Sequence, residues 1–157
     1  TSFSLSHPLA VEWMQGHAAD LVTGINQTTR DDLTKVLSDS LESGMSYDKT
    51  ATKIRSMFDD FSNPVGQGYL RDRAELVAVT ESAYAYEAGG RIAMWDLAQY
   101  IQMEKRWMAA PEACLLCLEN SGESWIKFED IFANGGQTPP GHPGCRCATE
   151  YRRQQAP

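Results

Sequence analysis

The last third of this 157-residue chain is governed by one stretch, Pro-Pro-Gly-His-Pro-Gly-Cys-Arg-Cys at residues 139–147. A second pair of cysteines, Cys114 and Cys117, precedes it in the pattern Cys-x-x-Cys, and 27 residues separate the two pairs. Residues 109–147 are rich in glycine and proline, which favour turns over long regular elements. The order of this segment is therefore expected to depend on what its cysteines bind.

Zinc is the ligand that the cysteine and histidine spacing favours. A Cys-x-x-Cys turn directs two thiolates at one point, and a distant Cys/His pair completes a tetrahedron around the ion. His142 stands three residues before Cys145, which is a conventional ligand spacing. We therefore predict a structural zinc site. Its ligands are Cys114, Cys117, His142 and Cys145, with Cys147 as an alternative ligand.

Other uses of the cysteines remain open at this level. Two disulfides between the pairs would close loops of about 30 residues and contribute roughly 3–4 kcal/mol each. They require an oxidising compartment, and residues 1–8 show no basic and apolar export signal. A metal- or thiol-dependent hydrolase or nucleic-acid-processing enzyme is the alternative function. It would need an open coordination position and a general base such as Glu112 or Glu150.

The first 99 residues have the periodicity of helices. A stripe of apolar and small residues at three- and four-residue spacing runs from Leu33 to Leu41, and Gly44 ends it. Ser46 begins a second helix, which Asn63-Pro64 terminates. A longer helix is predicted from about Tyr69 to Ala88. Gly89-Gly90 is expected to break it before helix resumes to about Gln99.

The remaining residues have a different pattern. Residues 100–108 alternate loosely between apolar and polar, residues 125–128 could form a short strand or a turn, and residues 148–153 resemble a last strand. The predicted fold class is α+β. Residues 1–99 are expected to be mainly helical. Residues 100–157 are expected to form a small antiparallel β unit and a turn-rich segment held by the Cys/His cluster, and both parts belong to a single domain.

Composition excludes several classes of protein. The formal net charge is −7, which disfavours a general nucleic-acid binder, because such proteins need basic residues to displace phosphate counterions. Apolar runs fall short of the roughly 18 residues of a membrane-spanning helix. The four tryptophans are interpreted as core and interface anchors rather than as a platform for stacked bases. Neither a membrane nor a small-molecule substrate is expected as a partner.

Three charged residues are candidates for supporting the site. Arg146 lies between Cys145 and Cys147, where its side chain could hydrogen-bond the thiolates or a carboxylate, or point into solvent. Glu81 could be a buried anchor that receives Arg73 or Arg146. The alternative for Glu81 is an ordinary helix face with partners one turn away.

The motifs together resemble those of the Mu-type phage head-morphogenesis family, whose members are minor head or capsid proteins. The resemblance covers roughly residues 25–153. It rests on the Cys-x-x-Cys, the stretch at residues 139–147, Trp107 seven residues before the first cysteine, and a helix ending in Thr80-Glu81. Residues 44–46, a Gly-x-Ser break, fit as well. The family's usual arginine before Thr-Glu is Val79 here, so no role of that arginine is carried over.

The resemblance implies a structural role and no catalytic activity. It implies a minor component of a tailed-phage or prophage head that contacts the portal protein, the major capsid protein or both, and that touches packaged DNA. The expected location is the head interior at the portal vertex, with roles in procapsid maturation, DNA packaging or ejection. Synthesis in a reducing bacterial cytoplasm favours zinc or free thiols over disulfides.

Overall fold

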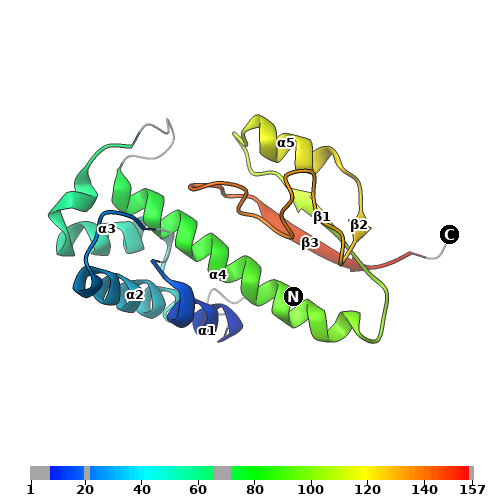
Figure 1. Cartoon of the computed structure of the whole chain (residues 1–157), viewed down its shortest axis with the longest axis horizontal. Coiled ribbons are helices and arrows are strands. Elements are labelled where there is room, and N and C mark those ends of the chain that lie inside the picture. The colour runs from blue at the N-terminus through cyan, green and yellow to red at the C-terminus, as the bar shows by residue number, and fades with distance from the viewer. Residues whose placement is uncertain (1–7, 20–21, 66–71, 156–157) are drawn as a thin grey trace.

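One long helix connects a layer of three helices to a small β unit (Figure 1). The computed structural model describes residues 8–19, 22–65 and 72–155. The elements are α1 (Pro8–His17), α2 (Gln27–Glu42), α3 (Tyr47–Met57), the 3-10 turn η1 (Asp59–Ser62), α4 (Arg73–Ala98), β1 (Met103–Met108), α5 (Leu115–Gly122), β2 (Ile126–Lys127) and β3 (Ala148–Arg153). The predicted α+β class is confirmed. That both parts form one domain stays a prediction.

The helices begin where short polar side chains can cap them. Asn26 accepts a hydrogen bond from the Thr29 amide at the start of α2, and Ser46 accepts one from the Lys49 amide at the start of α3. The predicted stripe on α2 is buried, including Leu33 at 0% exposure. This face of α2 forms the helical core together with side chains from α1, α3 and α4.

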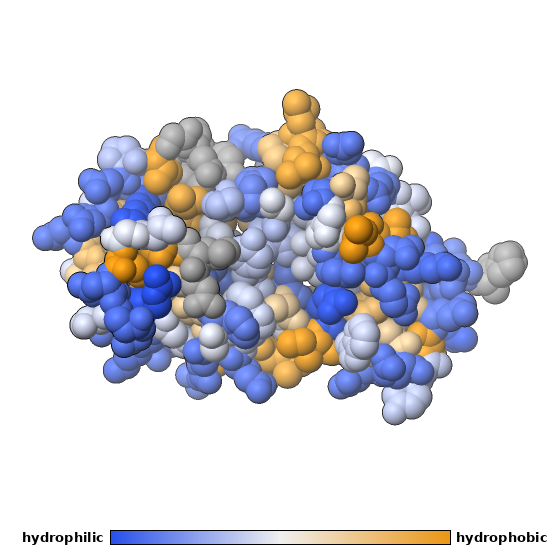
Figure 2. Space-filling view, in the orientation of Figure 1, coloured by the Kyte–Doolittle hydropathy of each residue, from blue (hydrophilic) through white to orange (hydrophobic). Residues whose placement is uncertain are grey.

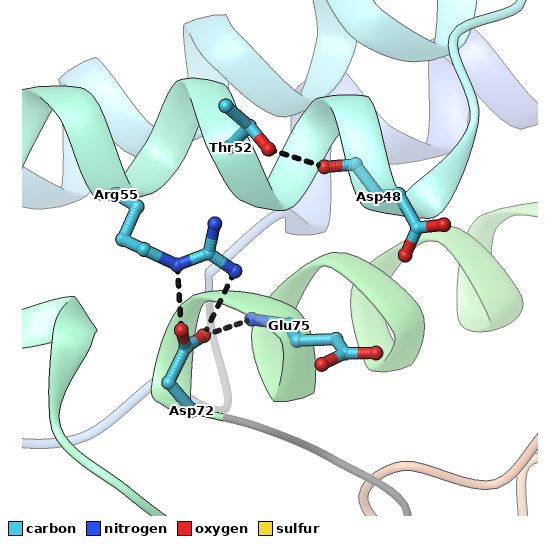
Figure 3. A network of polar contacts seen from close by, with 5 residues as sticks. All are labelled: Asp48, Thr52, Arg55, Asp72 and Glu75. Carbon is cyan, nitrogen blue, oxygen red and sulfur yellow. Dashed lines mark hydrogen bonds and ion pairs between the residues drawn. The ribbon is translucent and has the colours of Figure 1, made fainter.

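Asp72 fixes the start of α4 against α3 (Figure 3). Its carboxylate caps α4 by accepting a hydrogen bond from the Glu75 amide, with N and O 3.0 Å apart. The same carboxylate pairs with Arg55 of α3, whose Nε lies 2.5 Å and Nη2 3.2 Å from its oxygens. Asp72 is 4% exposed, so pairing is required to offset the cost of burying its charge. The predicted start of α4 at Tyr69 lies outside the described residues.

The expected break at Gly89-Gly90 is wrong, because α4 runs without interruption through both glycines. Gly89 faces α1, where a Cβ would lie 2.7 Å from the backbone nitrogen of Ala10. Nothing lies within 4 Å of the corresponding position on Gly90. Glycine at residue 89 therefore allows two helix backbones to approach closely, a tertiary role that a sequence pattern does not distinguish from helix breaking.

Alanine at these two neighbouring glycines should have opposite effects on stability. Gly89→Ala is expected to destabilise the protein by about 1–3 kcal/mol, because backbone atoms of α1 must move away. Gly90→Ala is the matched control and should stabilise by up to about 1 kcal/mol, since alanine is the better helix former. Urea unfolding of both variants measures the difference. Equal shifts would contradict the close contact between α1 and α4.

The β unit is a three-stranded antiparallel sheet with strand order β2-β1-β3. Along β1, Met103, Lys105 and Trp107 are buried, so one face of the strand points inward. On the other face Glu104 lies opposite Arg152, and Arg106 lies opposite Glu150. Both pairs form cross-strand ion pairs, with N–O distances of 2.8 and 2.6 Å. The predicted strand at residues 148–153 is confirmed, whereas β1 begins at Met103 rather than near Tyr100.

The β unit packs against the carboxyl-terminal half of α4. Trp95 of α4 packs on Phe128, which follows β2, with ring centroids 6.0 Å apart. The same Phe128 ring contacts Tyr151 of β3 at 5.9 Å. In the described residues, no helix combines the length and apolar character needed to span a bilayer.

Candidate metal centre

The four cysteines and His142 gather between α5 and the loop that leads into β3. Cys114 is the residue that precedes α5, and Cys117 lies in its first turn. His142, Cys145 and Cys147 come from the loop before β3. The sequence pattern did not predict the helix α5, because the many glycines and prolines of residues 109–147 favour turns. It places Cys117 on its buried face, where the side chain is 0% exposed.

The donor atoms have separations close to those of a tetrahedral zinc site. The Nε2 atom of His142 lies 3.2 Å from Cys114 Sγ and 3.6 Å from Cys117 Sγ. Cys117 Sγ lies 3.6 Å from Cys145 Sγ. Bonds of about 2.3 Å to sulfur and 2.0–2.1 Å to nitrogen place tetrahedral ligands roughly 3.5–3.8 Å apart. These three separations fit a zinc ion, but Cys145 stands outside the group of Cys114, Cys117 and His142, so it lies more than 4.8 Å from the donor atom of Cys114, of His142 or of both.

Cys117 belongs to two groups of donors that could each hold a metal ion. One group is Cys114, Cys117 and His142, and the other is Cys117, Cys145 and Cys147. Within each group all donor atoms lie within 4.8 Å of one another. Cys147 also accepts a hydrogen bond from the Ala110 amide, with N and Sγ 3.4 Å apart. Each of the five donors that the sequence singled out thus belongs to one of two adjoining groups of three, which share Cys117.

The imidazole of His142 is oriented for ligation through Nε2. Its Nδ1 lies 2.8 Å from the carbonyl oxygen of Pro143. A carbonyl only accepts hydrogen bonds, so the ring hydrogen must be on Nδ1. The lone pair of Nε2 then points at the cysteines, which is the tautomer that a metal-binding histidine needs.

Burial strongly affects the thiols of this cluster. All four cysteines are free, and three of them, Cys117, Cys145 and Cys147, are buried. Burial raises the pKa of Cys117, and the neighbouring Cys145 raises it further. Burial likewise raises the pKa of Cys145. A cation at this position would compensate for the cost of burying thiolates, so metal binding would be coupled to the release of protons.

The cavity at the cluster is small. Its volume is about 50 Å³, and its lining includes Cys114, Cys117, His142, Cys145 and Cys147. Small-molecule sites usually measure roughly 300–1,000 Å³, so this cavity suits an ion better than a substrate. Of the two candidate bases, Glu112 lines the cavity. Glu150 is paired with Arg106 on the outer face of the sheet.

The buried cysteines belong to a compact apolar cluster. It consists of Trp107, Phe132 and the three buried cysteines. The Trp107 ring meets the Phe132 ring edge-on, with centroids 5.2 Å apart and an interplanar angle of 82°. Cysteines therefore make up three of the five buried residues of this cluster.

Thr80 and Glu81 connect α4 to two other parts of the fold. The Thr80 hydroxyl oxygen accepts a hydrogen bond from the Gly144 amide at 2.8 Å, within the loop that carries His142 and Cys145. Glu81 is 2% exposed and accepts a hydrogen bond from the Ala19 amide at 3.2 Å. The sequence contains no local signal for either contact, because the partners lie 64 and 62 residues away.

The two candidate arginines contact different partners. Arg73 donates to the carbonyl oxygen of Thr23, and its guanidinium lies 4.6 Å from the centroid of the Phe61 ring. Arg146 pairs with Glu75 near the start of α4, with N and O 3.4 Å apart. Arg146 also lines the cavity of the cysteine cluster.

Glu87 is a second contact between α4 and the segment that follows the cluster. Its carboxylate accepts hydrogen bonds from the amide of Thr149 at 3.1 Å and from the Thr149 hydroxyl at 2.6 Å. Burial raises the pKa of Glu87 to about 7, and the hydrogen bonds from Thr149 oppose part of that rise. No sequence motif marked this residue.

Stability should fall as the pH rises toward 7 because of Glu87. Between its ordinary pKa of 4.5 and about 7, the folded state holds a proton that the unfolded chain has released. Protonation of Glu87 therefore adds to the free energy of unfolding in full below about pH 4.5, and this stabilisation is lost as the pH rises through about 7. The stabilisation is on the order of 3 kcal/mol.

Glu87→Gln should remove this pH-dependent stabilisation, whereas Glu129→Gln, at an exposed residue, should leave it unchanged. Urea unfolding from pH 4.5 to 8 measures it, and identical slopes for wild type and Glu87→Gln would contradict it.

The family comparison covers most of the chain. Residues 31–150 match the model of a family described as phage Mu protein F-like. The chain belongs to this family. No curated protein and no solved structure matches it. The family is one of phage head morphogenesis proteins, so the chain is assigned to the phage head.

The matched region of this Mu F-like chain extends from the second turn of α2 into β3. It contains all five sulfur and nitrogen donors, the Thr80-Glu81 pair and the whole of α4. The family resemblance seen in the sequence is thereby confirmed. The family is a structural one and points away from an enzyme.

Proposed function

We propose that this Mu F-like chain is a minor head protein whose carboxyl-terminal third is stapled by zinc. The observation that carries the proposal is the family match over residues 31–150, within which the five donors converge. The chain would act by binding other head proteins, the portal protein or the major capsid protein. Contact with packaged DNA is a secondary expectation, because the net charge of −7 disfavours extensive DNA binding.

The preferred zinc ligands are Cys114, Cys117, His142 and Cys145. The first three form one of the two donor groups, and the sulfur of Cys145 is 3.6 Å from that of Cys117. Cys147 is the remaining donor, and its sulfur already accepts the Ala110 amide. When bound, zinc would hold the thiolates in place and supply no chemistry to a substrate.

A structural role is favoured over a hydrolase at the same cluster. Each donor group offers three ligands, and Cys145, whose sulfur is 3.6 Å from that of Cys117, would be the fourth ligand that takes the position of an activated water. The cavity of about 50 Å³ does not accommodate a nucleotide or a peptide. Native thiol alkylation separates the two functions. Structural zinc thiolates should react slowly until a chelator is added, whereas a catalytic thiol of low pKa should react at once.

The proposed place is the portal vertex inside the head, reached after synthesis in the host cytoplasm. The test is sedimentation of the purified chain with purified portal protein, with purified capsid protein and with procapsids of the same phage. We expect the chain to sediment with the portal protein and with procapsids that contain it. If the chain sediments with none of the three, the proposed function is refuted.

A further inference from the structure

The helix α5 has its polar and apolar sides reversed relative to an ordinary surface helix. Its buried residues are Cys117 and Asn120. Residues three apart share a face of a helix, so these two side chains define the inward side. Cys117 points into the donor cluster, and the side chain of Asn120 accepts a hydrogen bond from the Asn134 amide at 3.1 Å. The inward face therefore contacts the protein mainly through polar and metal-binding groups.

Three leucines consequently point into solvent. Leu115 is 85% exposed, Leu118 is 49% exposed and Leu116 is 38% exposed. Apolar side chains stand out over the position of α5 in the space-filling view (Figure 2). Leaving a leucine exposed forgoes the favourable free energy that its burial would contribute. Grouped exposed apolar side chains of this kind mark interaction surfaces more often than isolated ones do.

The segment that carries these leucines is acidic, whereas Arg146, which is paired with Glu75, lines the adjoining cavity. Residues 107–126 contain no lysine or arginine but include Glu112, Glu119 and Glu123. Glu112 and Glu119 are exposed, and Glu123 accepts a hydrogen bond from the Ala133 amide. A two-fold dimer through this surface would place like charges against each other. The charge therefore disfavours a second copy of the chain and favours a partner with basic residues around an apolar groove.

We propose that Leu115, Leu116 and Leu118 form a docking surface that inserts into an apolar groove, rimmed by lysine or arginine, on the portal protein. This inference rests on the proposed function and identifies the surface through which it acts. The leucines Leu115 and Leu116 are the two residues between the Cys-x-x-Cys ligands. Ligation of both cysteines would therefore fix these leucines in the orientation that the partner binds.

The test compares two exposed leucines on different helices. Leu118→Asp places a charge in the proposed surface, and Leu97→Asp makes the same change on α4 at a leucine that is 43% exposed. Binding to purified portal protein is measured by fluorescence anisotropy, with zinc content and circular dichroism recorded for each variant. Leu118→Asp should weaken binding by at least about tenfold, and Leu97→Asp should leave it within about twofold.

Charge supplies an independent test that leaves the leucines in place. Glu119→Lys should weaken binding several-fold, and added salt should weaken wild-type binding in the same direction. If the wild type binds the portal protein and neither Leu118→Asp nor Glu119→Lys changes affinity, the docking surface is refuted while the proposed function stands. If the wild type binds no head protein, both are refuted. Dimerisation of the wild type that Leu118→Asp abolishes would overturn the choice of partner.

Discussion

Replacing Cys117 by serine is expected to remove the metal and disorder most of residues 109–147. Cys117 is the one donor that belongs to both groups capable of holding a metal, so its loss impairs either ligand set. The buried cluster to which it belongs consists of two aromatic residues and three cysteines, so separation of the ligands disrupts most of that cluster. Zinc binding contributes roughly 10–16 kcal/mol in small zinc-dependent folds, where removal of the metal unfolds the chain.

Limited proteolysis and circular dichroism measure this effect. Cys117→Ser should be cleaved within residues 109–147, while α2, α3 and α4 keep their helical signal, because the helical core is built from α1 to α4. Chelator treatment of the wild type should reproduce the cleavage pattern. Cys147→Ser is the matched control and should retain the metal if His142 is a ligand. A Cys117→Ser protein as resistant as wild type would contradict a metal staple.

Trp107→Ala is expected to destabilise the β unit by about 3–5 kcal/mol. Trp107 is 2% exposed on the inner face of β1, and its ring packs edge-on against Phe132 beside the buried cysteines. Its Nε1 hydrogen has no partner among the described residues, so the loss is one of packing and not of a hydrogen bond. Removing the ring leaves a cavity next to the metal centre, which should also speed the release of zinc to a chelator.

Two other substitutions separate packing from general damage to the strand. Trp107→Phe keeps an aromatic ring and removes an unpaired polar hydrogen, so its cost should be well below that of alanine. Trp95→Ala removes a tryptophan that is 46% exposed and should cost clearly less than Trp107→Ala. Chemical unfolding monitored by near-ultraviolet circular dichroism ranks the three variants. Equal losses for Trp95→Ala and Trp107→Ala would contradict the packing account.

The sequence predicts the helical part well where the signals are local. The stripe from Leu33 to Leu41 forms the buried face of α2, because a three- to four-residue spacing directly specifies one side of a helix. Ser46 caps α3 because its side chain needs only a neighbouring amide three residues on. The strand at residues 148–153 is likewise found as predicted.

The errors arise where tertiary contacts decide the structure. Gly89 stays helical because its missing side chain makes room for the backbone of Ala10, a residue 79 positions earlier. The helix α5 was missed because the usual pattern is reversed, with Cys117 inward and Leu115 outward. In the same way, the contacts of Thr80 with Gly144 and of Glu87 with Thr149 join residues more than 60 positions apart.

The sequence identified the residues of the candidate site but not their arrangement in space. Spacing alone selected Cys114, Cys117, His142, Cys145 and Cys147, because ligand types in these patterns are uncommon without a shared role. Their convergence depends on α5 and on the loop held by Thr80, neither of which the sequence specifies locally. The choice of four ligands among the five stays a prediction.

Native mass spectrometry of the freshly purified chain tests the central claim most directly. The account predicts a mass larger than that of the reduced chain by one zinc ion, and loss of that ion with a chelator should accompany unfolding of the carboxyl-terminal segment. The same measurement on Cys117→Ser should show no bound zinc. A metal-free mass with four free thiols and an unchanged fold, or a mass four hydrogens lighter from two disulfides, would contradict the account.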